Sequence, residues 1–218
     1  MAALAATMSA ATPAGAVLLD FTDQSFISGL TETSGSFSGS VAGIGFNLST
    51  TDAAGINFDE ASVGGSCDGS ILACQIDGAG IGDDEIRGVT LDSGQEMLLS
   101  FNQTLHVGFL YFLDLFSNQD GTEQAKVSFD GGAPLFFDGV LSGDGGFLAS
   151  NAGLPVTATS ILFTALDLDG LRDDRTNDYA LAGLSVSAVP LPAALPLFAA
   201  ALGGFGLLSR RRRKPAGA

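Results

Sequence analysis

Acidic residues gather in two glycine-containing segments of the chain, 77–85 and 167–178. Calcium takes six to eight oxygen ligands from carboxylates and carbonyls, and glycines let a backbone turn tightly enough to direct them inward. We expect a calcium site in the second segment, with the ligands Asp167, Asp169, Asp173, Asp174 and Asp178. Neither segment has EF-hand spacing. A solvated acidic loop is the alternative in both places, and for 77–85 it is the favoured one.

Cys67 and Cys74 are the only cysteines, and the six residues between them include Gly69. In an oxidising compartment a pair at this spacing closes a small disulfide loop, so we predict that bond here. Two buried free thiols are the alternative. A structural zinc site needs four ligands. The chain has a single histidine, and zinc is therefore disfavoured.

Catalytic chemistry has little support in the sequence. His106 is the only histidine, so a Ser–His–Asp triad would have to use it, and no nucleophile stands beside it. A glycosidase needs two carboxylates about 5 to 10 Å apart, and 24 acidic residues supply such a pair by chance. No phosphate loop or nucleotide fingerprint is present in the sequence. We predict a non-catalytic protein, with a polysaccharide-active hydrolase as one alternative.

A second alternative is calcium-dependent carbohydrate binding. The acidic segment before the last predicted strand resembles carbohydrate-binding jelly rolls, in which a structural calcium lies near that strand. Sugars stack on aromatic side chains, and the chain has no tryptophan and only two tyrosines. The candidates for a stacking surface are Tyr111, Phe137, Phe147 and Tyr179.

Segment 17–188 carries all 24 acidic residues but only four of the nine basic ones, which gives it a formal charge of −20. Phosphate backbones require clustered cations, so nucleic acid is disfavoured as a partner. The negative excess keeps the protein soluble or is partly neutralised by calcium. A segment of roughly 170 residues fits one domain with a substantial core.

Short apolar or alternating segments separated by Gly, Asp, Asn and Ser predict many strands and almost no helix before residue 189. The predicted strands are 17–21, 33–37, 41–48, 56–61, 86–91, 96–101, 104–116, 125–129, 134–137, 147–149, 159–166 and 179–186. In 104–116 we expect Leu105, Val107, Phe109, Tyr111 and Leu113 on one face and Leu110 and Phe112 on the other. We predict an all-β, antiparallel, two-sheet sandwich of the jelly-roll type. A solenoid is the alternative, but no fixed-period repeat supports it.

The chain ends in an uncharged segment followed by a basic cluster. Apolar residues enter a bilayer and clustered cations stay on its cytoplasmic side, so the rest of the chain is expected outside the cytoplasm. A spanning helix needs about 20 residues, whereas 197–208 is the only stretch beyond Pro196 without interruption. We therefore predict a C-terminal hydrophobic helix that anchors the chain before processing. An ordinary single-pass anchor is the alternative.

Five residues open this segment, Val189, Pro190, Leu191, Pro192 and Ala193, and five close it, Arg210, Arg211, Arg212, Arg213 and Lys214. The three-part pattern over 189–214 resembles the PEP-CTERM sorting signals of Gram-negative bacteria, in their VPLPA variant. The resemblance implies cleavage by an exosortase-type membrane enzyme and delivery to the cell surface or exopolysaccharide matrix. Leu191 stands where the commonest motif has Glu, so the exosortase variant is open. About 120 residues before it, with a Cys-bounded loop, resemble β-sandwich ectodomains of proteins that carry this signal.

Residues 1–16 are rich in alanine and end in Pro-Ala-Gly-Ala, the small-residue pattern that precedes a signal-peptidase site. We predict the remnant of a signal peptide there, since a complete signal opens with basic residues; an alanine-rich disordered tail is the alternative. The expected organisation is 1–16 signal remnant, 17–188 ectodomain, 189–214 sorting signal and 215–218 disordered tail. The expected function is a structural or binding role at the cell surface or in the extracellular matrix of a Gram-negative bacterium, with polysaccharide as a partner.

Overall fold

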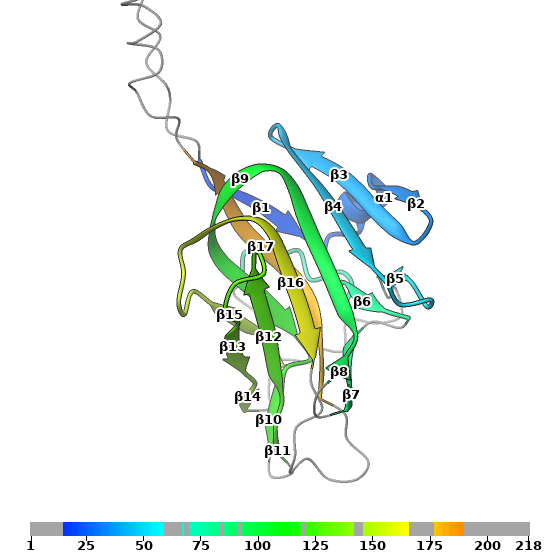
Figure 1. Ribbon diagram of the computed structural model, residues 1–218, viewed down its shortest axis with the longest axis vertical. Coiled ribbons are helices and arrows are strands. Elements are labelled where there is room, and N and C mark those ends of the chain that lie inside the picture. Colours follow the sequence, from blue (N-terminus) through cyan, green and yellow to red (C-terminus); the bar gives the residue numbers. More distant parts are fainter. Residues whose placement is uncertain are drawn as a thin grey trace, which may run out of the picture. The chain divides into compact units, whose positions relative to one another are not determined.

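The computed structural model describes residues 15–58, 67, 70–82, 85–90, 93–118, 121–141, 146–165 and 177–189. Residues Ala14–Ala188 form one compact unit. The predicted hydrophobic helix, the basic cluster, the disordered tail and nearly all of the signal remnant lie outside the described residues. Strands dominate the described part of the chain and pair almost entirely antiparallel, so the predicted all-β antiparallel class is confirmed (Figure 1).

The elements follow one another along the chain with only one short helix among the described residues. In order they are β1 (Val17–Asp20), α1 (Gln24–Ser28), β2 (Thr31–Thr33), β3 (Ser36–Val41), β4 (Ile44–Thr50), β5 (Ile56–Asn57), β6 (Gly80–Ile81), β7 (Ile86–Thr90), β8 (Ser93–Gly94), β9 (Glu96–Leu113), β10 (Phe116–Asn118), β11 (Gly121–Thr122), β12 (Gln124–Phe129), β13 (Leu135–Asp138), β14 (Val140–Leu141), β15 (Leu148–Ser150), β16 (Val156–Ala165) and β17 (Asp178–Ala188).

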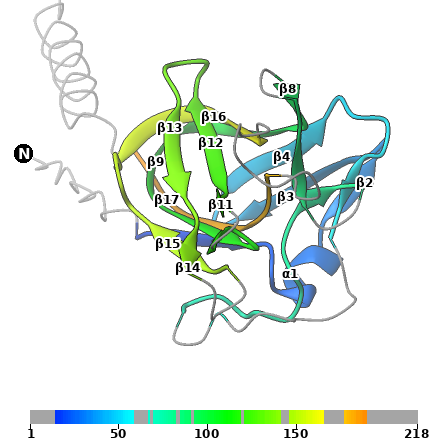
Figure 2. The ribbon, with the colours of Figure 1, turned by 90° about the horizontal axis from the view of Figure 1, so that it is seen from below.

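Strand β9 organises the main sheet, because one of its edges pairs with β16 along both halves whereas the other edge passes from β4 to β17. The first half lies between β4 and β16, with Leu48 and Ile161 both opposite Leu99. Beyond β16 the sheet continues into the β12–β13 hairpin, and beyond β4 into β3 and β2 (Figure 2). The second half pairs with β17 on one edge and, on the other, first with the start of β16 and then with β15, and β17 also pairs with β1. Strand β9 therefore arches from one part of the sheet into the other (Figure 1).

Apolar side chains from both halves of β9 meet in one core. Met97 and Leu99 of the first half belong to the same buried cluster as Leu110 and Phe112 of the second. In the first half, successive side chains point to opposite faces of the sheet. Met97 and Leu99 therefore point into the core, and Leu98 between them is partly exposed. The bend itself, Asn102–Thr104, is polar and exposed, as expected where a strand leaves the core.

The predicted facing of the second half of β9 is wrong at its start. Leu105 and Val107 share the main core with Leu110 and Phe112, not with Tyr111 and Leu113. The pairing with β17 explains the change, since Val186 lies opposite Val107 and Ser185 opposite Phe109, so Gly108 is an extra residue. A β-bulge of this kind shifts the alternation by one residue, and glycine accommodates it at little steric cost.

Strand β16 has its own irregularity between Ala158 and Ser160, and Asp130 holds it. One carboxylate oxygen of Asp130 accepts hydrogen bonds from the Thr159 amide at 2.9 Å and from the Ser160 amide at 2.8 Å. The hydroxyl groups of Thr159 and Ser160 donate to the same oxygen at 2.8 and 3.1 Å. Desolvation raises the pKa of Asp130, but these four hydrogen bonds outweigh it and lower the pKa below its ordinary value of 3.8.

Two predicted strands were drawn through tight turns. The prediction 33–37 crosses the turn Ser34–Gly35, and 41–48 crosses Ala42–Gly43; both residues of each turn have positive φ. Serine and alanine adopt that conformation rarely, so the glycine is the one sequence signal for each turn. The segments predicted as 96–101 and 104–116 are one strand up to Leu113. Helix α1 was not predicted; Asp23 caps it, accepting from the amides of Ser25 and Phe26.

Candidate functional site

The second half of β9 and its neighbour β17 are buried on both faces over part of their length. On the face away from the main core, a second apolar cluster joins Tyr111 and Leu113 of β9 to Ala180 and Ala182 of β17. We call this side of the two strands the outer face. The cluster is completed by Cys67, Leu72 and Cys74. We call the segment 67–74, of which the structure describes 67 and 70–74, the disulfide loop.

The described residues of the disulfide loop cover part of the outer face. Cys67 and Cys74 are joined by a disulfide, as the sequence predicts, with their Cα atoms 6.1 Å apart. Cys67 and Leu72 are buried against the strands, whereas Ile71 at the tip is 64% exposed. The bond therefore closes a small loop whose inward side chains supply a core on a second sheet face.

Two polar residues at and just beyond the end of β1, Asp20 and Thr22, fix the loop to the sheet. Asp20 accepts through one oxygen from the amide and hydroxyl of Thr22, at 2.9 and 2.6 Å, and through the other from the Ala73 amide at 2.7 Å. The Thr22 hydroxyl in turn accepts from the Cys74 amide at 2.9 Å. Both side chains are buried, so the loop's amides find their partners inside the protein. The Asp-x-Thr pattern indicates such a turn in the sequence, although it does not reveal the contact with Ala73.

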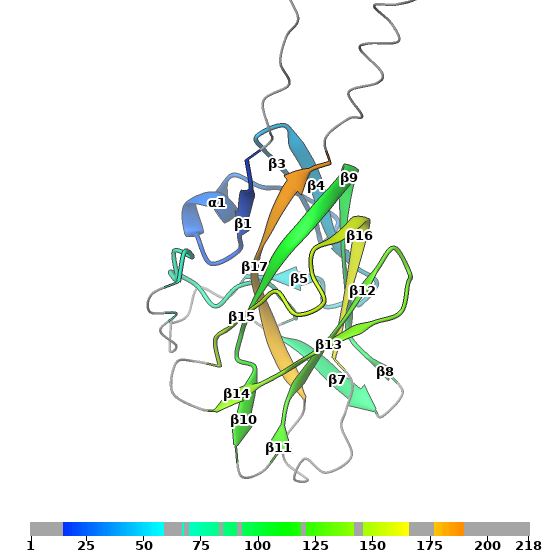
Figure 3. The same ribbon diagram turned by 90° about the vertical axis from the view of Figure 1, so that its left-hand side faces the viewer.

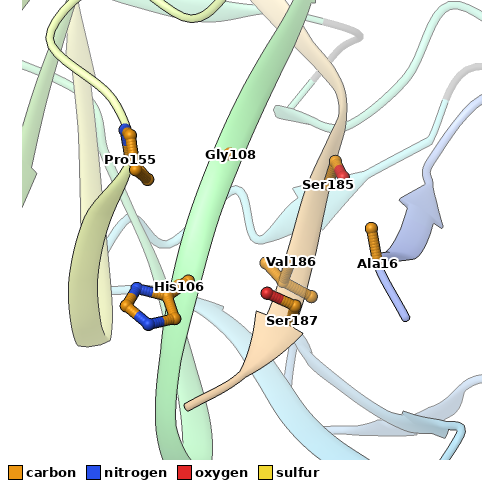
Figure 4. A pocket seen from close by; sticks show the side chains of 7 residues that line it. All are labelled: Ala16, His106, Gly108, Pro155, Ser185, Val186 and Ser187. Atoms are coloured by element: carbon orange, nitrogen blue, oxygen red, sulfur yellow. The ribbon is translucent and has the colours of Figure 1, made fainter. Parts of the chain in front are cut away.

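The rest of the outer face is open. A hollow of about 310 Å³ crosses β9 and β17 there, lined by Ala16, His106, Gly108, Pro155, Ser185, Val186 and Ser187. Figure 4 shows the imidazole of His106 and the hydroxyls of Ser185 and Ser187 on either side of Gly108. His106 lies opposite Ser187 in the pairing of the two strands. The hollow places a histidine beside two serines, but no carboxylate is among its lining residues to complete a triad.

An aromatic row begins beside the hollow. Phe109, which lies opposite Ser185, stacks on Tyr111 with ring centroids 6.1 Å apart and planes at 16°. Tyr111 stacks on Phe147 at 6.5 Å and 11°. Phe109 is 39% exposed, whereas burial of Tyr111 raises the pKa of its phenol. Tyr111 and Phe147 are two of the stacking candidates expected from the sequence, whereas Phe109 was not among them.

The other two predicted stacking candidates belong to the core. Phe137 packs on Phe112 with centroids 5.3 Å apart, and Tyr179 packs edge-on against the same ring at 5.5 Å. Burial raises the pKa of Tyr179, and its hydroxyl donates to the Thr164 carbonyl at 3.1 Å. Both rings are buried, so neither can contact a ligand. Aromatic residues of a strand point to one face or the other according to their position, and the residue type alone does not reveal which face that is.

Of the five predicted calcium ligands, Asp178 is the one that the structure describes. Its carboxylate lies 3.8 Å from Arg87 Nε, and Arg87 also pairs with Glu85 at 3.2 Å. Asp167, Asp169, Asp173 and Asp174 lie outside the described residues. Within the described ranges, no group of three or more His, Cys, Asp or Glu side chains could hold a metal. Calcium binding stays a prediction.

Asn177, beside Asp178, has a structural contact. Its side-chain oxygen accepts from the Gln124 amide at 2.6 Å and its amide nitrogen donates to the Gln124 carbonyl at 3.0 Å. It is fully buried, and it ties the start of β17 to β12. Asn177 therefore serves the fold at the end where the second acidic segment enters β17.

The sorting motif meets the described part of the chain only at Val189, which follows β17 and is partly exposed. None of the helices among the described residues has the length and apolar character needed to cross a membrane. Comparison of the chain with family models, curated proteins and solved structures finds no match in any of the three.

Proposed function

We propose that the chain is an exported, non-catalytic protein of a Gram-negative cell surface or exopolysaccharide matrix, released from the membrane by an exosortase-type enzyme. The observation that carries this proposal is the order of three elements, namely the motif 189–193, an apolar stretch, and the five basic residues 210–214. Clustered cations at the end of an apolar segment stay on the cytoplasmic side of the membrane. The domain that precedes the apolar segment is therefore expected outside the cytoplasm.

Two features of the domain support this proposal. The disulfide between Cys67 and Cys74 suits an oxidising compartment. Strand β1 begins and β17 ends at the same end of the domain, since Val17 lies opposite Val186 (Figure 3). Asp178 lies at the other end of the 11-residue strand β17, about 26 Å from Val186 at the rise of an extended strand.

The folded-over sheet is best described as a two-sheet sandwich of the jelly-roll type. This proposal rests on the arch of β9, which passes from β4 to β17 along one edge while both of its halves share one core. Sandwiches of this kind bury the inner faces of two sheets against each other. Their outer faces serve as binding surfaces, which suits a matrix protein.

The sorting step is tested in a Gram-negative host that carries an exosortase, with the full chain and intact-mass measurement of each cell fraction. We expect a surface form that lacks everything after the motif. The double variant Pro190→Ala, Pro192→Ala should remain at full mass in the membrane fraction. The matched control, Pro196→Ala, changes a proline outside the motif and should be processed normally. A full-length chain in the cytosol with both thiols reduced would contradict the proposal.

Calcium binding needs its own measurement. An ion that binds only the folded state raises the midpoint of unfolding. We expect millimolar calcium to raise the midpoint of the purified exported chain relative to chelator, and the double variant Asp173→Asn, Asp174→Asn to lose that shift. Equal midpoints with calcium and with chelator would retire the calcium prediction.

A further inference from the structure

We propose that the open half of the outer face binds a neutral polysaccharide, with the Phe109 ring as its stacking surface and the hollow beside it as a site for hydroxyl groups. The inference deepens the proposed function by naming a ligand class and a site. The inference rests on the proposed export only because the domain must meet the polysaccharide outside the cell. Binding itself can be tested on the purified protein.

The aromatic row has the geometry that a sugar ring requires. Phe109 and Tyr111 lie two residues apart on β9, and Phe147 immediately precedes β15, which pairs with β9. The three rings lie nearly parallel, at 16° and 11° to their neighbours. A pyranose ring presents a face of C–H groups that packs on the negative face of an aromatic ring. Phe109 ends the row and is 39% exposed, so its ring can contact a ligand. Packing against Tyr111 holds the ring in place before any ligand arrives, which lowers the entropy lost on binding.

The hollow supplies the polar groups beside that ring. Serine hydroxyls both donate and accept hydrogen bonds, and an imidazole ring offers two nitrogens for hydrogen bonding. These groups match the hydroxyl groups at the edge of a sugar ring, which also donate and accept. Ser185 lies opposite Phe109 and Ser187 opposite His106, so the polar and aromatic groups occupy neighbouring positions of the same two strands. Binding sites typically combine an apolar wall with a few convergent polar groups in this way.

Charge decides which polysaccharide fits. None of the seven lining residues carries a carboxylate, an ammonium or a guanidinium group. The segment 17–188 has a formal charge of −20. Its field repels anionic polymers such as uronates at low ionic strength. A neutral polymer meets no such repulsion, and its hydroxyl groups match the hollow.

The test is affinity electrophoresis of the purified chain in native gels that contain hydroxyethyl cellulose, dextran or galactomannan, with alginate as the anionic comparison. We expect retardation by at least one neutral polymer and none by alginate. Phe109→Ala should weaken the retarding interaction about tenfold, the loss of roughly one ring contact. The matched control is Phe136→Ala, which removes a ring that is 51% exposed on β13 and should bind as the unchanged chain does.

A second variant tests the hollow without removing any side chain. A methyl group at Gly108 would meet only the Ser185 carbonyl oxygen, at 3.8 Å, so Gly108→Ala should fold normally and narrow the hollow. We expect weaker retardation with an unchanged unfolding midpoint.

Several results would overturn the inference. They are retardation by none of the three neutral polymers, equal retardation of Phe109→Ala and the unchanged chain, or preference for alginate. Each of these leaves the sorting proposal untouched, because that proposal is read out by mass and location. Conversely, failure of processing at 189–193 does not alter the electrophoresis.

Discussion

Along the outer face of β9 and β17, one half is buried under the disulfide loop and the other half is open to solvent. The covered half presents Ala180 and Ala182 from β17, whereas the open half presents Ser185 and Ser187 from the same strand. The small alanine side chains let the loop approach the sheet closely. The serine hydroxyl groups lie where no loop covers the sheet, so water can satisfy their hydrogen bonds. The difference teaches that a short cross-linked loop can extend the core of a domain onto a second sheet face while the neighbouring surface stays open to solvent.

Removing the disulfide should have the largest effect on this contrast. Closing a loop over a sequence separation of 7 stabilises the folded state by about 2.5 kcal/mol through the chain entropy of the unfolded state. We expect the double variant Cys67→Ser, Cys74→Ser to lose about that much in chemical unfolding and to expose the apolar cluster to a hydrophobic dye. A variant as stable as the unchanged chain would mean that the loop holds its place without the bond.

Truncating the loop's inward side chain should come next. Leu72 is buried against the covered half, so Leu72→Ala should destabilise the domain by about 2 kcal/mol. Its neighbour Ile71 is 64% exposed, and Ile71→Ala should change the free energy of unfolding by less than about 0.5 kcal/mol. Equal effects from the two adjacent substitutions would show that the disulfide loop is not packed on the sheet.

The polar attachment of the disulfide loop should be worth somewhat less. Asp20→Asn keeps the shape of the side chain but replaces one acceptor oxygen by an NH₂ donor. That donor then faces another donor, either the amide of Thr22 or the amide of Ala73, and no hydrogen bond forms there. A buried donor left without a partner costs about 1–2 kcal/mol. Chemical unfolding measures this loss, and hydrogen exchange should show faster exchange at the Ala73 amide. Unchanged protection of that amide would contradict the assigned hydrogen bond.

The smallest effect belongs to Asp130, which holds the β16 irregularity and is exposed, unlike Asp20. Its pKa is lowered on folding, so its contribution is complete well above pH 3.8 and is lost as the pH falls through the lowered folded value. Asp130→Asn should cost less than about 1 kcal/mol at pH 7, since solvent screens an exposed group. The gap between variant and unchanged chain should narrow below about pH 4. If the difference in unfolding free energy between Asp130→Asn and the unchanged chain stays constant from pH 7 to below pH 4, the ionised carboxylate is not its cause.

The sequence predicted the strand-rich class, the strands 125–129 and 134–137 to within one residue, and the disulfide. Those features depend on local signals, namely alternation and cysteine spacing. The turns at Ser34 and Ala42 were missed because their conformation is imposed by the pairing of β2, β3 and β4. Tertiary context overrides local preference in such places.

The covered and open halves of the outer face could not be predicted, because their contacts join segments far apart in the chain. Leu72 packs in one cluster with Tyr111 and Ala182, and no pattern near any of the three indicates the others. The bulge at Gly108 also reversed the expected facing of Leu105 and Val107. An isolated glycine within a strand pattern indicates such a bulge, and this was the one available signal.

The position of β17 between β1 and β9 has a mechanical consequence. A force applied after Ala188 pulls along the axis of β17 and loads its hydrogen bonds to both neighbours in shear, so that they resist together instead of opening one after another. A domain attached through this strand would withstand the drag of flowing liquid better than one attached through a short edge strand such as β2.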